Sequence, residues 1–227
     1  MGNHFGFKKV IATEDAIFKL TNEILNALNN KTMAVSIFCN LEKAFNSVNH
    51  DLLLSELPYY GISGKAKLLL ESYLQNRYQG VQIINLYLNS NTVWNWSTVE
   101  YGVPQGSVLG PLLFLVYIND LTTTIEYKAI PVLFADDIID IITSPNNVKF
   151  QSDLNVVFGQ LNKWFMTSLL SLNFDKTYVI LFTNKVHVFL TYKLHMKIKK
   201  CVHLLKQNFL GYLLKILFLG RHTLSLN

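Results

Sequence analysis

Two adjacent aspartates, Asp136 and Asp137, are the residues of this sequence best suited to chemistry. They stand between two apolar runs, residues 130–135 and 138–142, and Pro131 lies near the start of the first run. Short apolar runs on both sides of a polar pair predict a β-hairpin with the carboxylates at its tip. Mg²⁺ takes oxygen ligands and is usually held by one or two carboxylates together with substrate phosphates. The pair therefore predicts a divalent-metal site.

A solvated turn is the alternative interpretation, since aspartate is a common turn residue. Two like charges side by side repel each other, and aspartate is unfavourable in strands. A tip between two apolar strands is poorly placed to be only a solvated turn. We therefore favour the metal site.

Composition excludes several classes of protein. Half of the 227 residues are hydrophobic, so the chain is not disordered and has enough apolar side chains for a substantial core. The longest apolar run, residues 112–118, is far shorter than the roughly 18 residues of a membrane span. Residues 1–9 lack the apolar segment of a secretory signal. Two cysteines, Cys39 and Cys201, form neither a disulfide framework nor a metal-binding spacing. We expect an intracellular protein, in the nucleus or the cytoplasm, with no membrane partner.

The net charge of +5 is unevenly distributed along the chain. Residues 1–175 contain 11 basic and 15 acidic side chains, whereas residues 176–227 contain 9 basic side chains and no acidic one. A basic terminal segment predicts a polyanion partner, most simply nucleic acid. A poorly folded basic tail is the alternative.

The elements that must position the aspartates follow from hydrophobic periodicity and turn signals. We expect helices over residues 13–28, from Asn49, from Ser63, over about 108–120 and over 148–165; strands are expected over 33–38, 81–88, 98–101 and 178–182. Helices and strands interleave without strict βαβ alternation, so the sequence predicts an α+β domain.

Three segments together resemble one family, the reverse transcriptases of jockey-like non-LTR retrotransposons. They are the acidic hairpin, residues 101–114 (YGVPQGSVLGPLLF) and the earlier strand and turn at residues 37–45. The resemblance runs from about Gly6 to about Tyr212, and residues 101–114 are its most specific part. It implies a right-hand polymerase palm, an antiparallel sheet packed on helices, with partial fingers and a truncated thumb.

The resemblance also implies a division of the chain. Residues 1–32 correspond to partial fingers, residues 33–50 and 101–184 to the palm, and residues 51–100 to a fingers/palm connecting segment. Residues 185–227 correspond to the palm edge and a truncated basic thumb. We expect no endonuclease in this chain.

The implied activity is that of an RNA-directed DNA polymerase, with an RNA template, a DNA primer and deoxynucleoside triphosphates as partners. The primer 3′ hydroxyl attacks the α-phosphate of the nucleotide, and two Mg²⁺ ions, with Mn²⁺ as the alternative, lie about 4 Å apart. Family members hold these ions with three carboxylates. Asp136 and Asp137 match the hairpin pair, and the first-strand position falls on Asn40.

The amide at Asn40 is the most consequential departure from the family. An amide oxygen can bind a metal ion but brings no negative charge, and two close cations need neutralisation. Asp51, eleven residues later, is a poor substitute because it lies in the next predicted helix. Loss of an outer partner of a metal site already costs roughly 10- to 100-fold in affinity or activity. We therefore expect this chain to be inactive or severely impaired.

Four further positions match functional residues of the family. Phe45 matches the aromatic that stacks under the sugar and excludes a 2′ hydroxyl, and an ordinary core aromatic is the alternative. Gln105 and Gly106 match the loop that contacts the incoming nucleotide. Lys176 matches the lysine near the leaving pyrophosphate, and an ordinary surface lysine is the alternative. Residues 209–212 resemble the primer grip.

Two other functions compete with an active reverse transcriptase. A non-catalytic nucleic-acid-binding remnant of a decayed element is favoured by departures from the family pattern at Lys8, Val10, Ala12, Asn40 and Asn46. An RNA-directed RNA polymerase shares the palm and the double-aspartate hairpin. Phe45 disfavours that enzyme, because such a polymerase must accept a 2′ hydroxyl.

Overall fold

The computed structural model describes residues 5–6, 13–85, 90–93, 95–125, 128–145, 147–183 and 201–205. They belong to two compact units: Met1–Glu42 with Asn119–Asn227, and Lys43–Ile118. We refer to these as the sheet unit and the helix–hairpin unit and describe each by itself.

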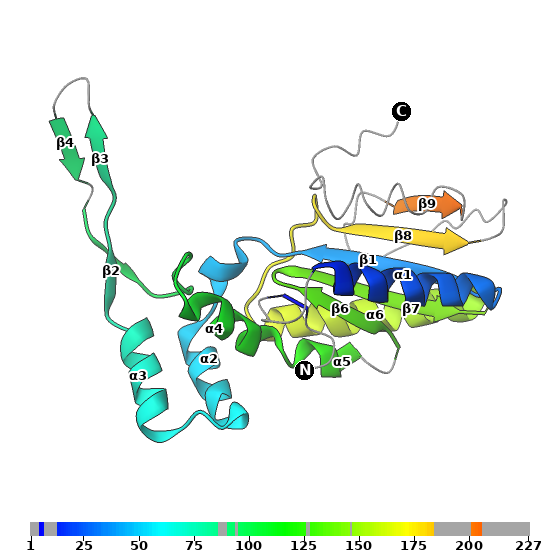
Figure 1. The fold of residues 1–227 in the computed structure, drawn as a ribbon, viewed down its shortest axis with the longest axis horizontal. Helices are drawn as coiled ribbons and strands as arrows, with labels where there is room; N and C mark the ends of the chain where they lie inside the picture. The colour runs from blue at the N-terminus through cyan, green and yellow to red at the C-terminus, as the bar shows by residue number, and fades with distance from the viewer. Residues whose placement is uncertain are drawn as a thin grey trace. The chain divides into compact units, whose positions relative to one another are not determined.

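A five-stranded sheet forms the centre of the sheet unit, in the order β6-β7-β1-β8-β9 (Figure 1). Its strands are β1 (Met33–Asn40), β6 (Ile130–Phe134), β7 (Asp137–Ser144), β8 (Tyr178–Thr183) and β9 (Cys201–Leu205). The central strand β1 pairs antiparallel with both β7 and β8, and β8 pairs parallel with β9. The predicted acidic hairpin is confirmed as β6–β7. The first strand is two residues longer than predicted, because its pairing with β7 extends to Asn40.

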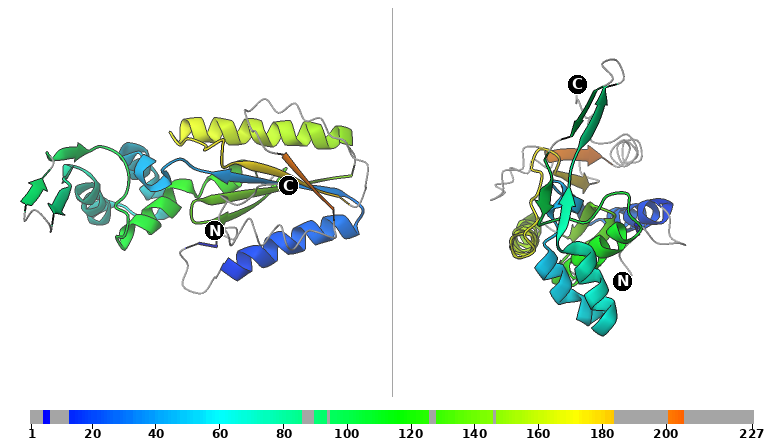
Figure 2. Two further views of the ribbon diagram at one scale, coloured as in Figure 1. Left: turned by 90° about the horizontal axis from the view of Figure 1, so that it is seen from above. Right: turned by 90° about the vertical axis from the view of Figure 1, so that its left-hand side faces the viewer.

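Helices α1 (Thr13–Asn29) and α6 (Asn147–Thr167) lie on opposite faces of this sheet (Figure 2). On the α1 face, Leu20, Ile24 and Leu28 pack in one cluster with sheet residues that include Phe38 and Ile139. Burial of large apolar side chains at helical spacing contributes roughly 1.5–3 kcal/mol per residue. The apolar stripe that the sequence predicts for α1 is therefore the surface that fixes it to the sheet.

A short helix, α5 (Leu121–Ile125), precedes β6 in the sheet unit. The Trp164 indole of α6 donates a hydrogen bond of 3.0 Å to the Asp120 carboxylate just before α5. Burial raises the pKa of Asp120 above its ordinary value, and the hydrogen bond from Trp164 partly opposes that rise. Lys128 forms an ion pair of 2.9 Å with Asp153 of α6. These contacts attach α6 to the segment that leads into the hairpin.

The helix–hairpin unit contains helices and two small sheets. Its elements are the 3₁₀ turns η1 (Ala44–Ser47) and η2 (Leu57–Tyr60), helices α2 (His50–Glu56), α3 (Gly64–Leu74) and α4 (Leu109–Ile118), and strands β2 (Arg77–Gln79), β3 (Gln82–Asn85), β4 (Ser90–Val93) and β5 (Ser97–Val99). Strand β2 pairs with β5, and β3 pairs with β4. The single strand predicted over residues 81–88 is wrong in extent: β3 covers four of its residues, and residues 86–89 lie outside the described part of the chain.

The predicted helix starts are confirmed in this unit. The Asn49 side chain caps α2 by accepting a 2.9 Å hydrogen bond from the Leu52 amide. Ser63 is the N-cap residue of α3, although its side chain accepts no capping hydrogen bond. Capping residues mark these starts because the first amides of a helix lack partners within the helix. Nowhere in the described residues is there a helix with the length and hydropathy needed to cross a bilayer.

One buried carboxyl in the sheet unit escaped the sequence interpretation. Asp140 lies in β7 opposite Pro131 of β6 and Ile37 of β1, and none of its surface is exposed. Neither of its carboxylate oxygens has a hydrogen-bond partner among the described residues. Burial raises the pKa of Asp140 to about 8. This aspartate is therefore a core residue and not an addition to the acidic tip.

We predict that Asp140 makes the stability of the protein depend on pH. In the unfolded chain its carboxyl ionises near pH 4, whereas in the folded chain it keeps its proton up to a pKa of about 8. The folded state then binds more protons between these values, so the free energy of unfolding falls as pH rises through this window. Urea unfolding of the unmodified chain and of Asp140→Asn at about pH 6 and about pH 9 measures the effect, since ordinary carboxyls do not titrate there.

The asparagine variant is a near-isosteric control that cannot ionise. We expect its unfolding free energy to change less between the two pH values than that of the unmodified chain. An equal pH dependence in both proteins would show that Asp140 does not titrate in this range.

Candidate functional site

Three residues of the predicted metal site meet at one end of the five-stranded sheet. Asn40, the last residue of β1, is paired in register with Asp137, the first residue of β7. Phe134 is also paired with Asp137, so Ala135 and Asp136 form a two-residue loop. Directly opposite residues of an antiparallel pair point to the same face, with Cβ atoms about 4.5–5.5 Å apart. The structure therefore places the amide of Asn40 beside the carboxylate of Asp137, next to the loop that carries Asp136.

The hairpin loop has an unusual backbone, and Phe5 and Gly6 lie against the hairpin. Ala135 has a φ of 54°, in the left-handed region that costs a non-glycine residue roughly 1–2 kcal/mol. The Phe5 amide donates a 2.8 Å hydrogen bond to the Leu133 carbonyl, which ties the two segments together. A Cβ atom at Gly6 would overlap the backbone nitrogen of Ala135. Only glycine therefore fits at position 6 without a shift of the loop.

A turn at residues 173–177 holds the end of β1. The Asn173 amide donates to the Asn40 carbonyl at 2.8 Å, and the Asn40 amide donates to the Thr177 hydroxyl at 3.4 Å. The Thr177 hydroxyl in turn donates to the Asn173 carbonyl at 2.8 Å. The Lys176 amide donates to the backbone carbonyl and the side-chain oxygen of Asn173, each at 3.1 Å. The structure therefore brings the half-buried Lys176 to the same end of the sheet as Asn40.

Sequence reasoning missed the anchoring roles of Asn173 and Thr177. The available signal was the presence of Asn and Thr near the predicted lysine, since their side chains commonly bond the backbone of turns. Nothing in the local sequence indicates that the turn contacts β1, because 133 residues separate Asn40 from Asn173.

The donor set at the hairpin suits a divalent metal ion only in part. Asp136 and Asp137 supply carboxylate oxygens, and Asn40 supplies a neutral amide oxygen; all three residues are half-buried. Two carboxylates with substrate phosphates are a usual environment for one Mg²⁺. The described residues contain no group of three or more histidine, cysteine, aspartate or glutamate side chains placed to hold a metal. The residues therefore fit one ion, and they are one carboxylate short of the set expected for two.

The residues predicted to contact the nucleotide lie in the helix–hairpin unit. The ring of Phe45, in η1, stacks on Phe114 of α4 with centroids 4.8 Å apart and planes inclined by 24°. The Val103 amide donates to the Phe45 carbonyl at 2.7 Å, and the Gly102 amide donates to the Val48 carbonyl at 2.7 Å. Phe45 is partly exposed. Its segment and the glycine-rich loop are therefore held together by backbone hydrogen bonds.

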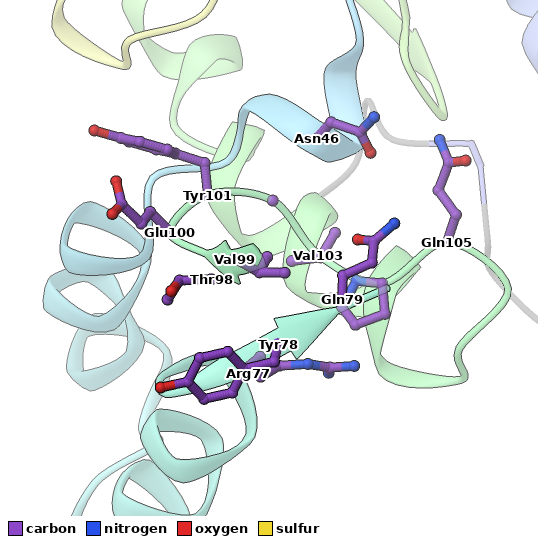
Figure 3. A pocket seen from close by; sticks show the side chains of 12 residues that line it. Asn46, Arg77, Tyr78, Gln79, Thr98, Val99, Glu100, Tyr101, Val103 and Gln105 are labelled. Atoms are coloured by element: carbon purple, nitrogen blue, oxygen red, sulfur yellow. The ribbon is translucent and has the colours of Figure 1, made fainter. Parts of the chain in front are cut away.

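Gln105 and Gly106 lie at the exposed turn of that loop. The loop leads into α4 through Ser107, whose hydroxyl donates to the Pro104 carbonyl at 2.7 Å and accepts from the Gly110 amide at 3.0 Å. Gln105 also borders a pocket of about 770 Å³ (Figure 3). The pocket is lined by Asn46, by residues 77–79 of β2 and by residues 98–105. Sequence analysis did not anticipate the part that β2 plays in it.

Several predicted positions lie outside the described residues. They are Lys8, Val10 and Ala12 of the fingers motif, the primer-grip segment 209–212, and most of the basic segment 185–227. The assignment of the chain to fingers, palm, connecting segment and thumb stays a prediction, as do the roles of the individual site residues.

Comparison with known proteins gives a consistent picture. A family model described as reverse transcriptase (RNA-dependent DNA polymerase) matches residues 2–214. The chain is 32% identical over 195 residues to "Probable RNA-directed DNA polymerase from transposon BS" of Drosophila melanogaster, an alignment that covers 81% of this chain and 20% of that protein. It is 27% identical over 187 residues to "RNA-directed DNA polymerase from mobile element jockey" of the same species, covering 80% and 20%. The chain thus spans about a fifth of these curated relatives.

Solved structures of telomerase share the fold. Apo telomerase of Candida tropicalis, truncated from its C-terminal domain, has a TM-score of 0.57 at 14% identity, over 83% of this chain and 37% of that one. Telomerase of Candida albicans has a TM-score of 0.56 at 11% identity, over 78% and 32%. Identities this low speak for the fold alone. The predicted α+β polymerase palm is confirmed.

We predict that Gly102 fixes the glycine-rich loop to the Phe45 segment. Gly102 and Gly106 both have positive φ, 90° and 79°, so alanine is strained at either position. A Cβ at Gly102 would lie 2.8 Å from the Asn46 Cα, whereas one at Gly106 would meet nothing within 4 Å. Gly106→Ala should cost about 1 kcal/mol and Gly102→Ala clearly more. Urea unfolding of the two variants measures the difference, and equal losses would show that the contact with Asn46 is unimportant.

Proposed function

The chain belongs to the reverse transcriptase (RNA-dependent DNA polymerase) family, and from this we propose that it is the RNA-directed DNA polymerase domain of a jockey-like non-LTR retrotransposon. Its reaction is nucleotidyl transfer. The primer 3′ oxygen forms a bond to the α-phosphorus of a deoxynucleoside triphosphate, and pyrophosphate leaves. The observation that carries the proposal is the pairing of Asn40 with Asp137 beside the Asp136 loop, because it assembles the three family positions at one end of the sheet.

Enzymes of this family use divalent metal ions. We propose that Asp136 and Asp137 hold the metal, which is Mg²⁺ or Mn²⁺. A site with the complete set of three carboxylates would hold two such ions. Bound ions lower the pKa of the attacking hydroxyl and stabilise charge on the leaving pyrophosphate. Asn40 donates a lone pair of its amide oxygen to this site but no charge. We infer that the chain as it stands is severely impaired in nucleotide addition.

The remaining predicted residues act on the nucleotide. Phe45 supports the sugar and excludes a 2′ hydroxyl; its partial exposure and its stacking on Phe114 are compatible with a ring that is held on one side and available on another. Gln105 and Gly106 contact the incoming nucleotide from an exposed turn. Lys176 neutralises the leaving pyrophosphate from the turn that is bonded to Asn40.

The partners of the proposed reaction are an RNA template, a DNA primer and deoxynucleoside triphosphates. These substrates are found inside cells, and we propose that the chain works in the nucleus or the cytoplasm. A non-catalytic nucleic-acid-binding remnant is the second candidate, and a specific observation favours it: the position opposite Asp137 is an amide and not a carboxylate.

We predict that Asn40→Asp raises primer extension on an RNA template by at least 10- to 100-fold, because the variant restores a charged metal ligand where an outer partner alone contributes that much. The measurement is primer extension with Mg²⁺ and, in parallel, with Mn²⁺. Asn162→Asp is the matched control, since Asn162 is exposed on α6 and the change adds the same charge away from the hairpin. Asn40→Asp combined with Asp136→Asn should lose the gain.

Extension by the single variant alone supports a polymerase silenced at one ligand. If all the proteins are folded and none extends the primer, the polymerase proposal is contradicted for this chain and the binding remnant takes its place. A gain equal to that of the Asn162→Asp control would mean that the added charge acts non-specifically.

A further inference from the structure

The pocket of about 770 Å³ in the helix–hairpin unit has a single cation on its wall, the guanidinium of Arg77. Arg77 and Arg221 are the chain's two arginines, against 18 lysines. The guanidinium of Arg77 is held in place: its carbon lies 5.2 Å from the centre of the Tyr73 ring, and Nη1 donates to the Tyr73 carbonyl at 3.4 Å. A fixed guanidinium loses little conformational entropy when it binds a ligand.

None of the described carboxylates forms an ion pair with Arg77. Glu100 also lines the pocket, but Figure 3 shows its carboxylate and the guanidinium turned to opposite sides of the view. A guanidinium presents several donors in a planar fork that matches the oxygens of a phosphate. Its remaining donors are therefore suited to an anionic group that enters the pocket.

The rest of the lining is suited to a nucleotide unit. Amide side chains of Asn46, Gln79 and Gln105 offer both donors and acceptors, which matches the edge of a base. Tyr78 and Tyr101 also line the pocket, with 65% and 55% of their surfaces exposed, and Figure 3 shows their rings on the opposite side of the view from the guanidinium. Bases of single strands stack on exposed aromatic rings. A phosphate at Arg77 therefore has neighbouring groups for a sugar and base.

A single-stranded nucleic acid accounts for these features better than a free nucleotide does. The volume lies in the upper half of the range for small-molecule sites, and the pocket is bordered by an exposed two-stranded ribbon, β2–β5. Trp96, next to β5, is 69% exposed, and its ring lies 3.2 Å from where a Cβ of Gly80 would stand. Side chains alternate along β2, so the Tyr78 ring lies on the face of the ribbon opposite to Arg77 and Gln79 and offers an aromatic surface there. Further bases of a strand have a surface on which to stack.

We propose that this pocket binds one nucleotide unit of a single-stranded nucleic acid, with its phosphodiester at Arg77 and its base against the amides of the lining. This inference rests on the proposed function for the nature of the partner. It adds Arg77, in the segment between the two family motifs at residues 37–45 and 101–114, as a binding residue that the family comparison did not assign.

The test is equilibrium binding of the full chain to a labelled single-stranded RNA of about 15 nucleotides and to a DNA of the same sequence, without metal or nucleotide. Arg77→Gln should weaken binding about tenfold at low salt and reduce the slope of log affinity against log salt by about 0.7 to 1. Lys65→Gln is the charge-matched control, because Lys65 is exposed on α3 and is not part of the pocket lining.

A second pair of variants leaves the contact between Arg77 and Tyr73 unchanged. Gln79→Glu places a negative charge on the pocket wall, and Gln82→Glu makes the same change on β3, outside the lining; both glutamines are exposed. We expect Gln79→Glu to weaken binding several-fold and Gln82→Glu to have a clearly smaller effect. Glu100→Gln should strengthen binding.

If Arg77→Gln weakens the binding of RNA more than that of DNA, the pocket takes RNA, and the reverse result means that it takes DNA. A loss of affinity for either nucleic acid supports the site. Equal affinities for Gln79→Glu and Gln82→Glu would overturn it, as would no binding of either strand by the unmodified chain. Because no catalysis is measured, a failure here is distinct from a failure of Asn40→Asp to extend a primer.

Discussion

The register between β1 and β7 is the constraint on which the candidate site depends. Strand β1 lies in the middle of the sheet and is buried over nearly its whole length, with α1 on one face of the sheet and α6 on the other. Side chains alternate between the two faces, so a slip by one residue would exchange the side chains that point towards α1 with those that point towards α6 and disrupt the packing on both faces. The same register that packs Phe38 beside Ile139 also sets Asn40 opposite Asp137. Packing of the core therefore aligns the polar end of the strand.

The β6–β7 hairpin offers less negative charge to a metal ion than its number of aspartates indicates. Asp140 is three residues beyond Asp137, so it points to the opposite face of β7, where burial keeps it protonated near neutral pH. It cannot share the charge of a metal ion at the tip. With an amide at position 40, two carboxylates remain at the three positions predicted to hold the metal. The chain therefore has the fold of a polymerase but lacks one of the three negative charges that we expect in the metal site of an active one.

The helix–hairpin unit shows a second way of holding a functional loop. Backbone hydrogen bonds from Gly102 and Val103 attach the loop to the segment of Phe45, and the positive φ of Gly102 allows the two chains to approach closely. The loop edge also borders the Arg77 pocket. One glycine-rich segment therefore carries the residues proposed to contact the nucleotide and also forms part of the wall of the Arg77 pocket. A change in the attachment of the loop would affect both.

The sequence by itself determined the features that depend on neighbouring residues: the helix starts at Asn49 and Ser63, the acidic hairpin, the α+β class and the polymerase family. Caps, turn residues and hydrophobic periodicity act over a few positions, so they can be read without the fold. Tertiary structure decided which residues face each other. The pairing of Asn40 with Asp137, the burial of Asp140 and the turn that joins Asn173 to Asn40 all connect segments roughly 100 or more residues apart. Such contacts follow from the packing of whole elements, and no local pattern specifies them.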